Sequence, residues 1–278
     1  MTVKIVTDTL SDISFDMAAK LGVTVIPLYV RFGEKVYKDR VDMTSEEFYR
    51  KLVNESVFPS TTQPTPHDFE QVYSSLAKET DEILVISASS KLSGTFGSAK
   101  QAKELVKGKA RIEVIDSLAV ATGLELVVIE VAEAAKAGAS LDDAIALAKK
   151  SLSKIHWVAY FDTLKYLARG GRIGKAQGLL GSMLSVKPLL TLREGEMAPL
   201  TRVRSFNAAL DYIYSMASSV PKIKRVAVEH SATPESADKC ADKLSALYPK
   251  EKIIRSVISP VLGTYGGPNA MAVAILAE

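Results

Sequence analysis

The feature that most constrains the fold is an alternation of strand-like and helical segments through the first half of the chain. Short apolar runs at 3–8, 82–87 and 111–117 are each followed by segments with helical spacing of apolar residues. Two of the helices are expected to begin at capping boxes, at Thr44 and at Ser140. Because parallel strands need crossover helices, this pattern predicts an α/β domain whose mainly parallel sheet has helices on both faces.

Polar residues follow directly after these strands. Asp8 ends the first strand, Ser87–Ser93 follows the second, and Asp116–Ser117 follows the third. Ligands of open parallel sheets bind at the carboxyl ends of the strands. We therefore expect these residues to share one edge of the sheet.

The second half of the chain has a different pattern, because it contains a hairpin as well as helices. Segment 187–204 alternates apolar and polar residues and turns at Glu194–Gly195–Glu196, which predicts a β-hairpin. Further strand and helix patterns follow to the end of the chain. We predict two domains with a boundary near Lys154: an N-terminal α/β domain at 1–154 and a C-terminal α/β domain, with a mixed sheet and a hairpin, at 155–278.

Ser93, Gly94 and Thr95 form a candidate anion-binding turn in front of a predicted helix at 95–107. The first turn of a helix presents unpaired N–H groups and a partial positive charge. A glycine lets the backbone approach a ligand closely, and the two hydroxyls add donors. Ordinary helix capping is the alternative explanation. The turn lacks the G-x-x-x-x-G-K-[ST] pattern of a nucleotide-binding P-loop.

Three other segments combine polar groups with glycine or proline, and each also has an ordinary structural explanation. The loop PSTTQPTP presents Thr61 and Thr62, or simply leads into a helix cap. The segment RGGRIGK contains Arg172, which could bind a carboxylate or a phosphate, or could lie in a solvated helix break. The segment GTYGGPNA offers Tyr265 as a hydrogen-bond donor, or is a plain turn.

Composition excludes several classes of function. The formal net charge of +3 on 278 residues is too small to predict a nucleic-acid-binding face. The single cysteine, Cys240, permits no internal disulfide, which fits a reducing cytoplasm. The three histidines, His67, His156 and His230, have no metal-binding spacing, and no G-x-S-x-G motif occurs. We expect no metal, no cofactor, no signal peptide and no membrane-spanning segment.

Taken together and in order, six motifs resemble those of the DegV family of bacterial fatty-acid-binding proteins. The resemblance covers essentially the whole chain. The motifs are VTDTLSDIS, PSTTQPTP, SSKLSGTFGSA, VIDS, LARGGRIGKAQGLLGSMLSVKPLL and the Gly-Pro turn near the C-terminus. Each is weak alone, but the set is specific.

The resemblance implies a two-domain α/β fold with one long-chain fatty acid in an apolar tunnel between the domains. It also implies that the chain is the acyl-binding subunit of a fatty acid kinase and has no catalysis of its own. A separate ATP-binding kinase subunit would phosphorylate the bound carboxylate to an acyl phosphate for phospholipid synthesis. We expect a cytoplasmic protein that can contact a membrane surface transiently.

The resemblance implies that the family's head-group residues align with Thr61 or Thr62 and with Ser93. Gly94 would let the backbone approach the head group closely. Its GGRI arginine aligns with Arg172, near the head group. A further basic residue falls on Arg204 or Arg202, expected at the kinase-docking face.

The C-terminal turn departs from the family pattern, which has His followed by Gly-Pro-Gly. Tyr265 stands where the histidine would align, and Asn269 replaces the last glycine. Tyrosine still donates a hydrogen bond, but it cannot take the positive charge that histidine can.

A second hypothesis is a free-standing enzyme that acts on a small phosphorylated metabolite. Ser93 and Arg172 would then hold the phosphate, and Asp8 or Asp116 would serve as acid or base. This hypothesis predicts a small polar pocket. A lipid sensor without a kinase is a third hypothesis, which the sequence does not separate from the first.

Overall fold

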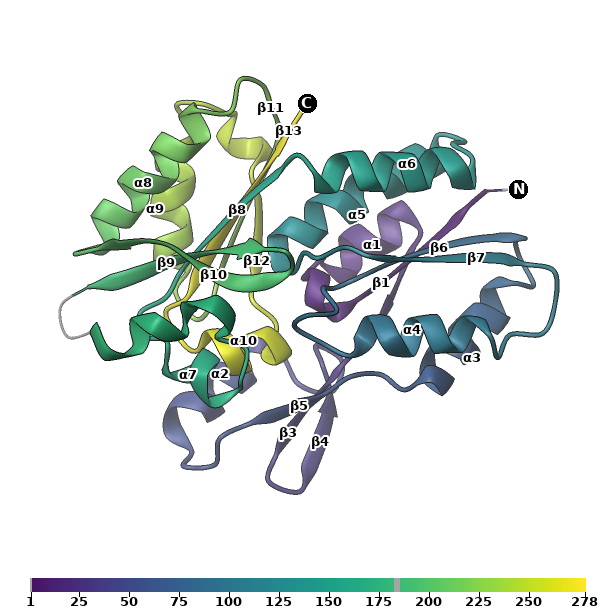
Figure 1. Ribbon diagram of the computed structural model, residues 1–278, viewed down its shortest axis with the longest axis horizontal. Helices are drawn as coiled ribbons and strands as arrows, with labels where there is room; N and C mark the ends of the chain where they lie inside the picture. Colours follow the sequence, from purple (N-terminus) through teal and green to yellow (C-terminus); the bar gives the residue numbers. More distant parts are fainter. Residues whose placement is uncertain (1, 183–185) are drawn as a thin grey trace.

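A computed structural model describes residues 2–182 and 186–278. The N-terminal sheet is parallel, with strand order β2-β1-β6-β7 (right in Figure 1). Its strands are β1 (Lys4–Asp8), β2 (Val23–Ile26), β6 (Glu82–Ser87) and β7 (Arg111–Asp116). Its apolar side chains point alternately to two faces, so Ile5 and Val6 belong to different core clusters.

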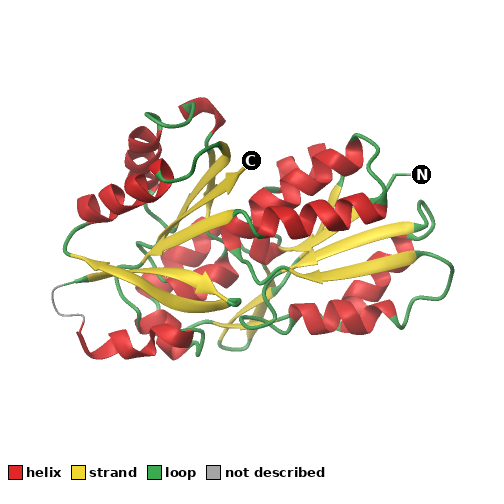
Figure 2. Cartoon of the chain, turned by 45° about the horizontal axis from the view of Figure 1, so that its top comes forward, coloured by secondary structure: helices red, strands yellow, loops and turns green. Residues whose placement is uncertain are grey.

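Helices cover both faces of this sheet, as Figure 2 shows. One face carries α1 (Phe15–Leu21), α5 (Ala121–Lys136) and α6 (Leu141–Leu152), and the other carries α3 (Pro66–Leu76) and α4 (Thr95–Lys103). The capping boxes predicted at Thr44 and Ser140 are present, at the starts of α2 (Ser45–Asn54) and α6. The predicted α/β class with a mainly parallel N-terminal sheet is therefore confirmed.

The C-terminal sheet is mixed, with strand order β10-β9-β8-β13-β11-β12 (left in Figure 1). Its strands are β8 (Ile155–Tyr160), β9 (Lys187–Arg193), β10 (Glu196–Val203), β11 (Ile223–His230), β12 (Ile254–Val257) and β13 (Met271–Ala277). The predicted hairpin is β9–β10, and it turns at Glu194–Gly195. One face of the sheet is covered by α8 (Phe206–Ser218) and α9 (Pro234–Leu244).

Helix α5 lies between the two sheets and packs against both, through β1 on one side and β8, β11 and β13 on the other. It is apolar nearly all round, and most of its residues are buried. A single core cluster therefore runs from the N-terminal sheet through α5 to the C-terminal sheet. The predicted boundary near Lys154 falls between α6 and β8, and the division into two domains there stays a prediction.

A small antiparallel sheet was not predicted. Its order is β4-β3-β5, formed by β3 (Tyr29–Phe32), β4 (Lys35–Lys38) and β5 (Ser60–Thr62). Segment 23–32 is apolar throughout much of its length, but it divides between two sheets on either side of Pro27, which has no N–H for a ladder. The hydroxyl-rich segment predicted as a loop pairs with β3 as the edge strand β5.

The remaining elements are helical. They are α7 (Lys165–Arg169), α10 (Pro260–Gly266) and three 3-10 helices, η1 (Thr9–Ser11), η2 (Gly174–Ser182) and η3 (Lys250–Lys252). The segment GTYGGPNA had a plain turn as its alternative reading, but its first half belongs to α10. The last part of the second helical piece predicted after Gly171, at 183–185, lies outside the described residues.

Buried carboxyl groups from the N-terminal half hold the start of α10. Asp12 accepts hydrogen bonds from the N–H of Ser259, 3.2 and 3.3 Å away. Asp39 accepts one from the N–H of Val261 at 3.3 Å. Burial raises the pKa of Asp39 from 3.8 to about 7, although the Arg40 guanidinium beside it acts in the opposite direction. These carboxyl groups fix α10, which comes from the far end of the sequence, against the N-terminal half.

We predict that Asp39→Asn flattens the dependence of stability on pH. Folded Asp39 binds its proton more tightly than the unfolded chain does, so it favours folding below its ordinary pKa of 3.8. That contribution is lost as the pH rises through about 7. In urea titrations, the free energy of unfolding of Asp39→Asn should fall less than that of the wild type between these two pH values.

Asp142→Asn is a control with the opposite sign. The hydrogen bond from Arg111 lowers the pKa of Asp142, so this group adds stability above its ordinary pKa and loses it as the pH falls. An Asp39→Asn profile parallel to that of the wild type would show that Asp39 is not protonated in the folded state.

Candidate functional site

A cavity with a polar wall lies where β5, α7, β10 and α10 meet the turn before α4; we call it the polar pocket. Its polar lining consists of Thr61, Gln63, Ser93, Arg172 and Tyr265. The rest of the lining is apolar and includes leucines, valines and a methionine. Four of the five polar residues had been singled out from the sequence, and the fold brings them together from distant parts of the chain.

The hydroxyls of Thr61 and Tyr265 are 2.5 Å apart, which joins β5 to α10. The Arg172 guanidinium lies over the Tyr265 ring, 5.0 Å from its centre. Arg172 donates through Nε to the carbonyl of Leu92 at 3.1 Å and through Nη1 to that of Gly170 at 2.8 Å. These bonds orient the guanidinium at the pocket wall and do not use Nη2.

The turn before α4 forms another part of the polar wall. The Ser93 hydroxyl lies 2.8 Å from that of Thr95 and accepts a hydrogen bond from the Thr95 N–H at 3.3 Å. The residue at the N-cap is Gly94, which has no side chain to cap the helix. Gly94 also touches Gln63, because a Cβ added there would lie 2.3 Å from Gln63 Nε2. Gln63 and Ser93 line the pocket and Gly94 does not, so the amino end of α4 lies directly behind these two residues.

Other predicted residues lie outside this pocket. Thr62 follows Thr61 on β5, points to the opposite face of the strand, and is exposed. Arg202 and Arg204 are exposed at the end of β10 and just after it, and they do not line the pocket. Their predicted role at a docking face stays a prediction.

Sequence reasoning missed Gln63, which lies between the predicted Thr pair and Pro64. An amide side chain carries both donors and an acceptor, so it fits a polar ligand as well as a hydroxyl does. The segment PSTTQPTP drew attention because of its hydroxyl groups, and Gln63 lies within the same proline-bounded segment. Its position there is the signal that could have identified it.

The polar pocket adjoins a second cavity, the apolar pocket. The linings of the two share five residues, Val120, Leu167, Met197, Leu262 and Tyr265. Farther in, the apolar pocket is lined by Trp157, Ala159, Phe161 and other residues of the C-terminal sheet. Each of the two cavities has a volume of about 60 Å³, so both are narrow.

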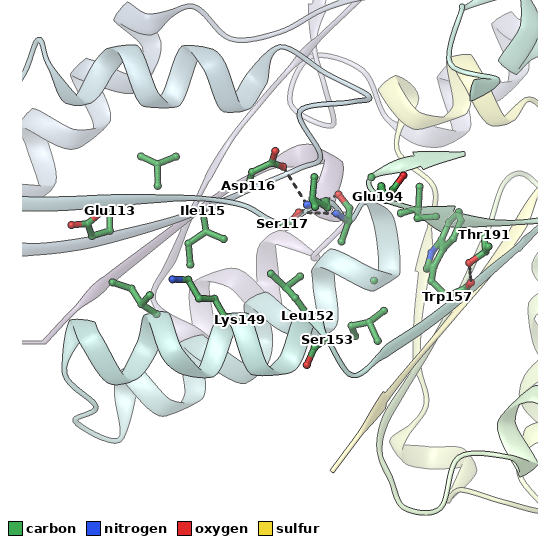
Figure 3. A pocket seen from close by; sticks show the side chains of 18 residues that line it. Glu113, Ile115, Asp116, Ser117, Lys149, Leu152, Ser153, Trp157, Thr191 and Glu194 are labelled. Atoms are coloured by element: carbon green, nitrogen blue, oxygen red, sulfur yellow. Dashed lines mark hydrogen bonds between the residues drawn. The ribbon is translucent and has the colours of Figure 1, made fainter. Parts of the chain in front are cut away.

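A larger groove lies on the outside, between α6, β7 and the β9–β10 hairpin (Figure 3); we call it the outer groove. The volume of the outer groove is about 640 Å³. Trp157 lies at one end, near Thr191 and Glu194, and Glu113 lies at the other (Figure 3). The groove mixes apolar walls with charged residues, among them Asp116 and Lys149.

Within residues 2–182 and 186–278, His, Cys, Asp and Glu side chains form no cluster suited to a metal ion. In the same part of the chain, no helix has the length and apolar character needed to cross a membrane.

The fold and the pockets define an α/β protein with two adjoining cavities, one with polar groups in its wall and one mainly apolar. The chain belongs to the DegV family, whose model matches residues 2–278. A DegV domain-containing protein from Caldanaerobacter subterraneus is 36% identical over 274 residues, which cover 98% of this chain and 97% of that protein.

Solved structures of the family are similar over the whole chain. A DegV family protein from Thermus thermophilus, described as fatty acid binding, has a TM-score of 0.92 and 32% identity, with 100% of both chains covered. DegV from Bacillus subtilis, described as a fatty acid binding protein, has a TM-score of 0.90 and 30% identity, again with 100% of both chains covered.

We predict that Tyr265→Phe destabilises the protein by about 1 kcal/mol, because it leaves the partly buried Thr61 hydroxyl without its partner. Tyr248→Phe is the matched control, since it removes an exposed hydrogen bond to the Lys224 carbonyl. Urea unfolding should show a larger loss for Tyr265→Phe than for Tyr248→Phe. Equal losses would mean that the hydrogen bond between Thr61 and Tyr265 does not contribute to the stability of the fold.

Proposed function

We propose that the chain binds one long-chain fatty acid, with its carboxylate in the polar pocket and its acyl chain in the apolar pocket. The observation that carries the proposal is the adjacency of the two cavities: a pocket with polar groups shares five lining residues with an apolar pocket. The similar proteins from Thermus thermophilus and Bacillus subtilis are described as fatty acid binding, which supports the same ligand class here.

The energetics fit an amphiphilic acid. Each buried methylene contributes about 0.8 kcal/mol, so a long chain can supply most of the affinity. A buried carboxylate must be hydrogen-bonded to be tolerated. The polar pocket offers the Ser93 hydroxyl, the amino end of α4 and the guanidinium of Arg172. In the pair formed by Thr61 and Tyr265, one hydroxyl donates to the other and the second keeps its proton for a ligand.

The narrowness of the cavities adds a condition. Their side chains must move apart to admit an acyl chain. Leu262 is on the short helix α10 and Met197 is near the start of β10, and both line the shared part of the two pockets. Methionine is well suited to such adjustment because its side chain is unbranched and flexible.

The finer part of the proposal concerns what happens to the bound acid. We infer from the family resemblance that the chain presents the carboxylate to a separate ATP-binding kinase subunit, which forms the acyl phosphate for phospholipid synthesis in the cytoplasm. The chain itself would perform no chemistry. Arg202 and Arg204 are exposed and lie outside the ligand cavity, as residues that dock a partner would.

Two observations favour this proposal over an enzyme that acts on a small phosphorylated metabolite. The first is that the polar pocket adjoins an apolar cavity, which a small polar substrate would not use. The second concerns the proposed acid–base residues. Asp8 accepts bonds from Ser87 and Ala88, Asp116 accepts from backbone N–H groups, and neither lines the polar pocket.

We predict that Thr61→Ala combined with Ser93→Ala weakens fatty-acid binding by at least about tenfold, because hydrogen bonds to a charged group contribute about 1.5–3 kcal/mol each. Binding is measured by native mass spectrometry and by titration with hexadecanoic acid. Thr62→Ala is the matched control and should bind like the wild type, because Thr62 lies on the other face of β5. If the double variant binds fatty acid with wild-type affinity, the carboxylate does not lie in this pocket.

We predict that Arg202→Ala with Arg204→Ala slows acyl phosphate formation by an added kinase subunit and ATP, while fatty-acid affinity is unchanged. Without the kinase subunit no acyl phosphate should form. Arg255→Ala is the control, since Arg255 is an exposed arginine on β12 paired with Asp238. Product formed by this chain and ATP alone would contradict the role of a presenting subunit.

A further inference from the structure

We propose that Trp157 closes the inner end of the fatty-acid cavity and thereby sets the length of acyl chain that the protein accepts. This inference rests on the proposed function and adds a residue that determines specificity. Trp157 is on β8, and it is the residue that the linings of the apolar pocket and the outer groove have in common among the described residues. Its side chain thus stands between the two spaces.

The other side of this partition is the start of α5. Val120 and Ala121 line the apolar pocket, whereas Ala119 and Gly123 line the outer groove. The indole packs directly on the helix backbone at Gly123, where an added Cβ would lie only 3.3 Å from Trp157 Cδ1. A glycine is needed for that close approach. The wall between the cavity and the groove is therefore thin, and the indole ring forms its central part.

The floor of the apolar pocket leaves room for the end of a chain next to this ring. Ala159 and Ala272 pair across β8 and β13, and Glu229 lies opposite Ala272 on β11. All three line the pocket, as does Trp157, two residues before Ala159 on the same face of β8. Small alanine side chains thus lead along the sheet toward the indole, and an acyl chain that follows them ends at Trp157.

The indole is held by packing, without a hydrogen bond. Its side chain is 7% exposed, yet Nε1 has no hydrogen-bond partner among the described residues. Rotation of the ring therefore breaks no hydrogen bond. On its far side the lining of the outer groove includes Leu152, Ile155 and Leu192, so a chain that passed the ring would meet apolar side chains.

Trp157 is the single tryptophan of the chain, so the intrinsic tryptophan fluorescence of the unmodified protein reports on this position alone. Bromine quenches an indole that it contacts. The test compares two forms of hexadecanoic acid, one brominated at the ω carbon and the other at the carbon next to the carboxyl group. The ω-bromo acid should quench the emission strongly, and the α-bromo acid should leave most of it, at equal occupancy measured by native mass spectrometry.

The outcomes separate this inference from the proposed function. Equal quenching by both acids, or none by either when both are bound, overturns the placement of the chain end at Trp157. Failure of both acids to bind instead overturns the proposed fatty-acid function.

A second experiment tests the length limit with Trp157→Leu, which keeps an apolar side chain but opens the partition. Each further methylene that becomes buried should strengthen binding roughly fourfold. The variant should therefore bind docosanoic acid more tightly than hexadecanoic acid, and the wild type should show the reverse order. Trp157→Phe, which keeps an aromatic ring in place, is the matched control and should retain the wild-type order. If Trp157→Leu keeps the wild-type order while its thermal unfolding remains cooperative, Trp157 does not set the limit.

Discussion

The burial of α5 between the two sheets is the interaction on which the rest of the structure depends. A helix that is apolar nearly all round has to be covered on every side. Here the N-terminal sheet covers one side and the C-terminal sheet the other, so the two halves share one continuous core. The cavities lie at the amino end of this helix, where Val120 and Ala121 face Leu262 and Met197 across a gap. The place of the two adjoining cavities is thus a consequence of where α5 begins.

The buried carboxyl groups are the costly part of this arrangement. Burial raises the pKa of Asp12, Glu125 and Glu229, so their charged forms are disfavoured where they lie. Replacing such groups with apolar ones is often neutral or stabilising, so stability alone does not explain them. Their geometric effect is specific, since Asp12 and Asp39 hold the first N–H groups of the segment that forms α10. That helix carries Tyr265 and Leu262 into the cavity.

Local signals in the sequence were sufficient for many of the elements and for much of the polar pocket. Capping boxes and the hairpin turn act within a few residues, and both were read correctly. The choice between Thr61 and Thr62 depended instead on the pairing of β5 with β3, which joins segments about thirty positions apart in the chain. A three-residue edge strand gives almost no periodic signal of its own. Trp157 was missed for the same reason, because its position matters only once β8 faces α5.

The contacts of Tyr265 show what a tyrosine contributes at this position. Its hydroxyl bonds Thr61, and its ring supports the Arg172 guanidinium. A histidine at this position could carry positive charge into the pocket, whereas a phenol cannot. The positive charge near a bound carboxylate is then supplied by Arg172 and the amino end of α4. Among the described residues, no histidine, the side chain that titrates near neutrality, lines the polar pocket. Carboxylate binding in this protein is therefore expected to depend less on pH near neutrality than it would with a histidine in the pocket.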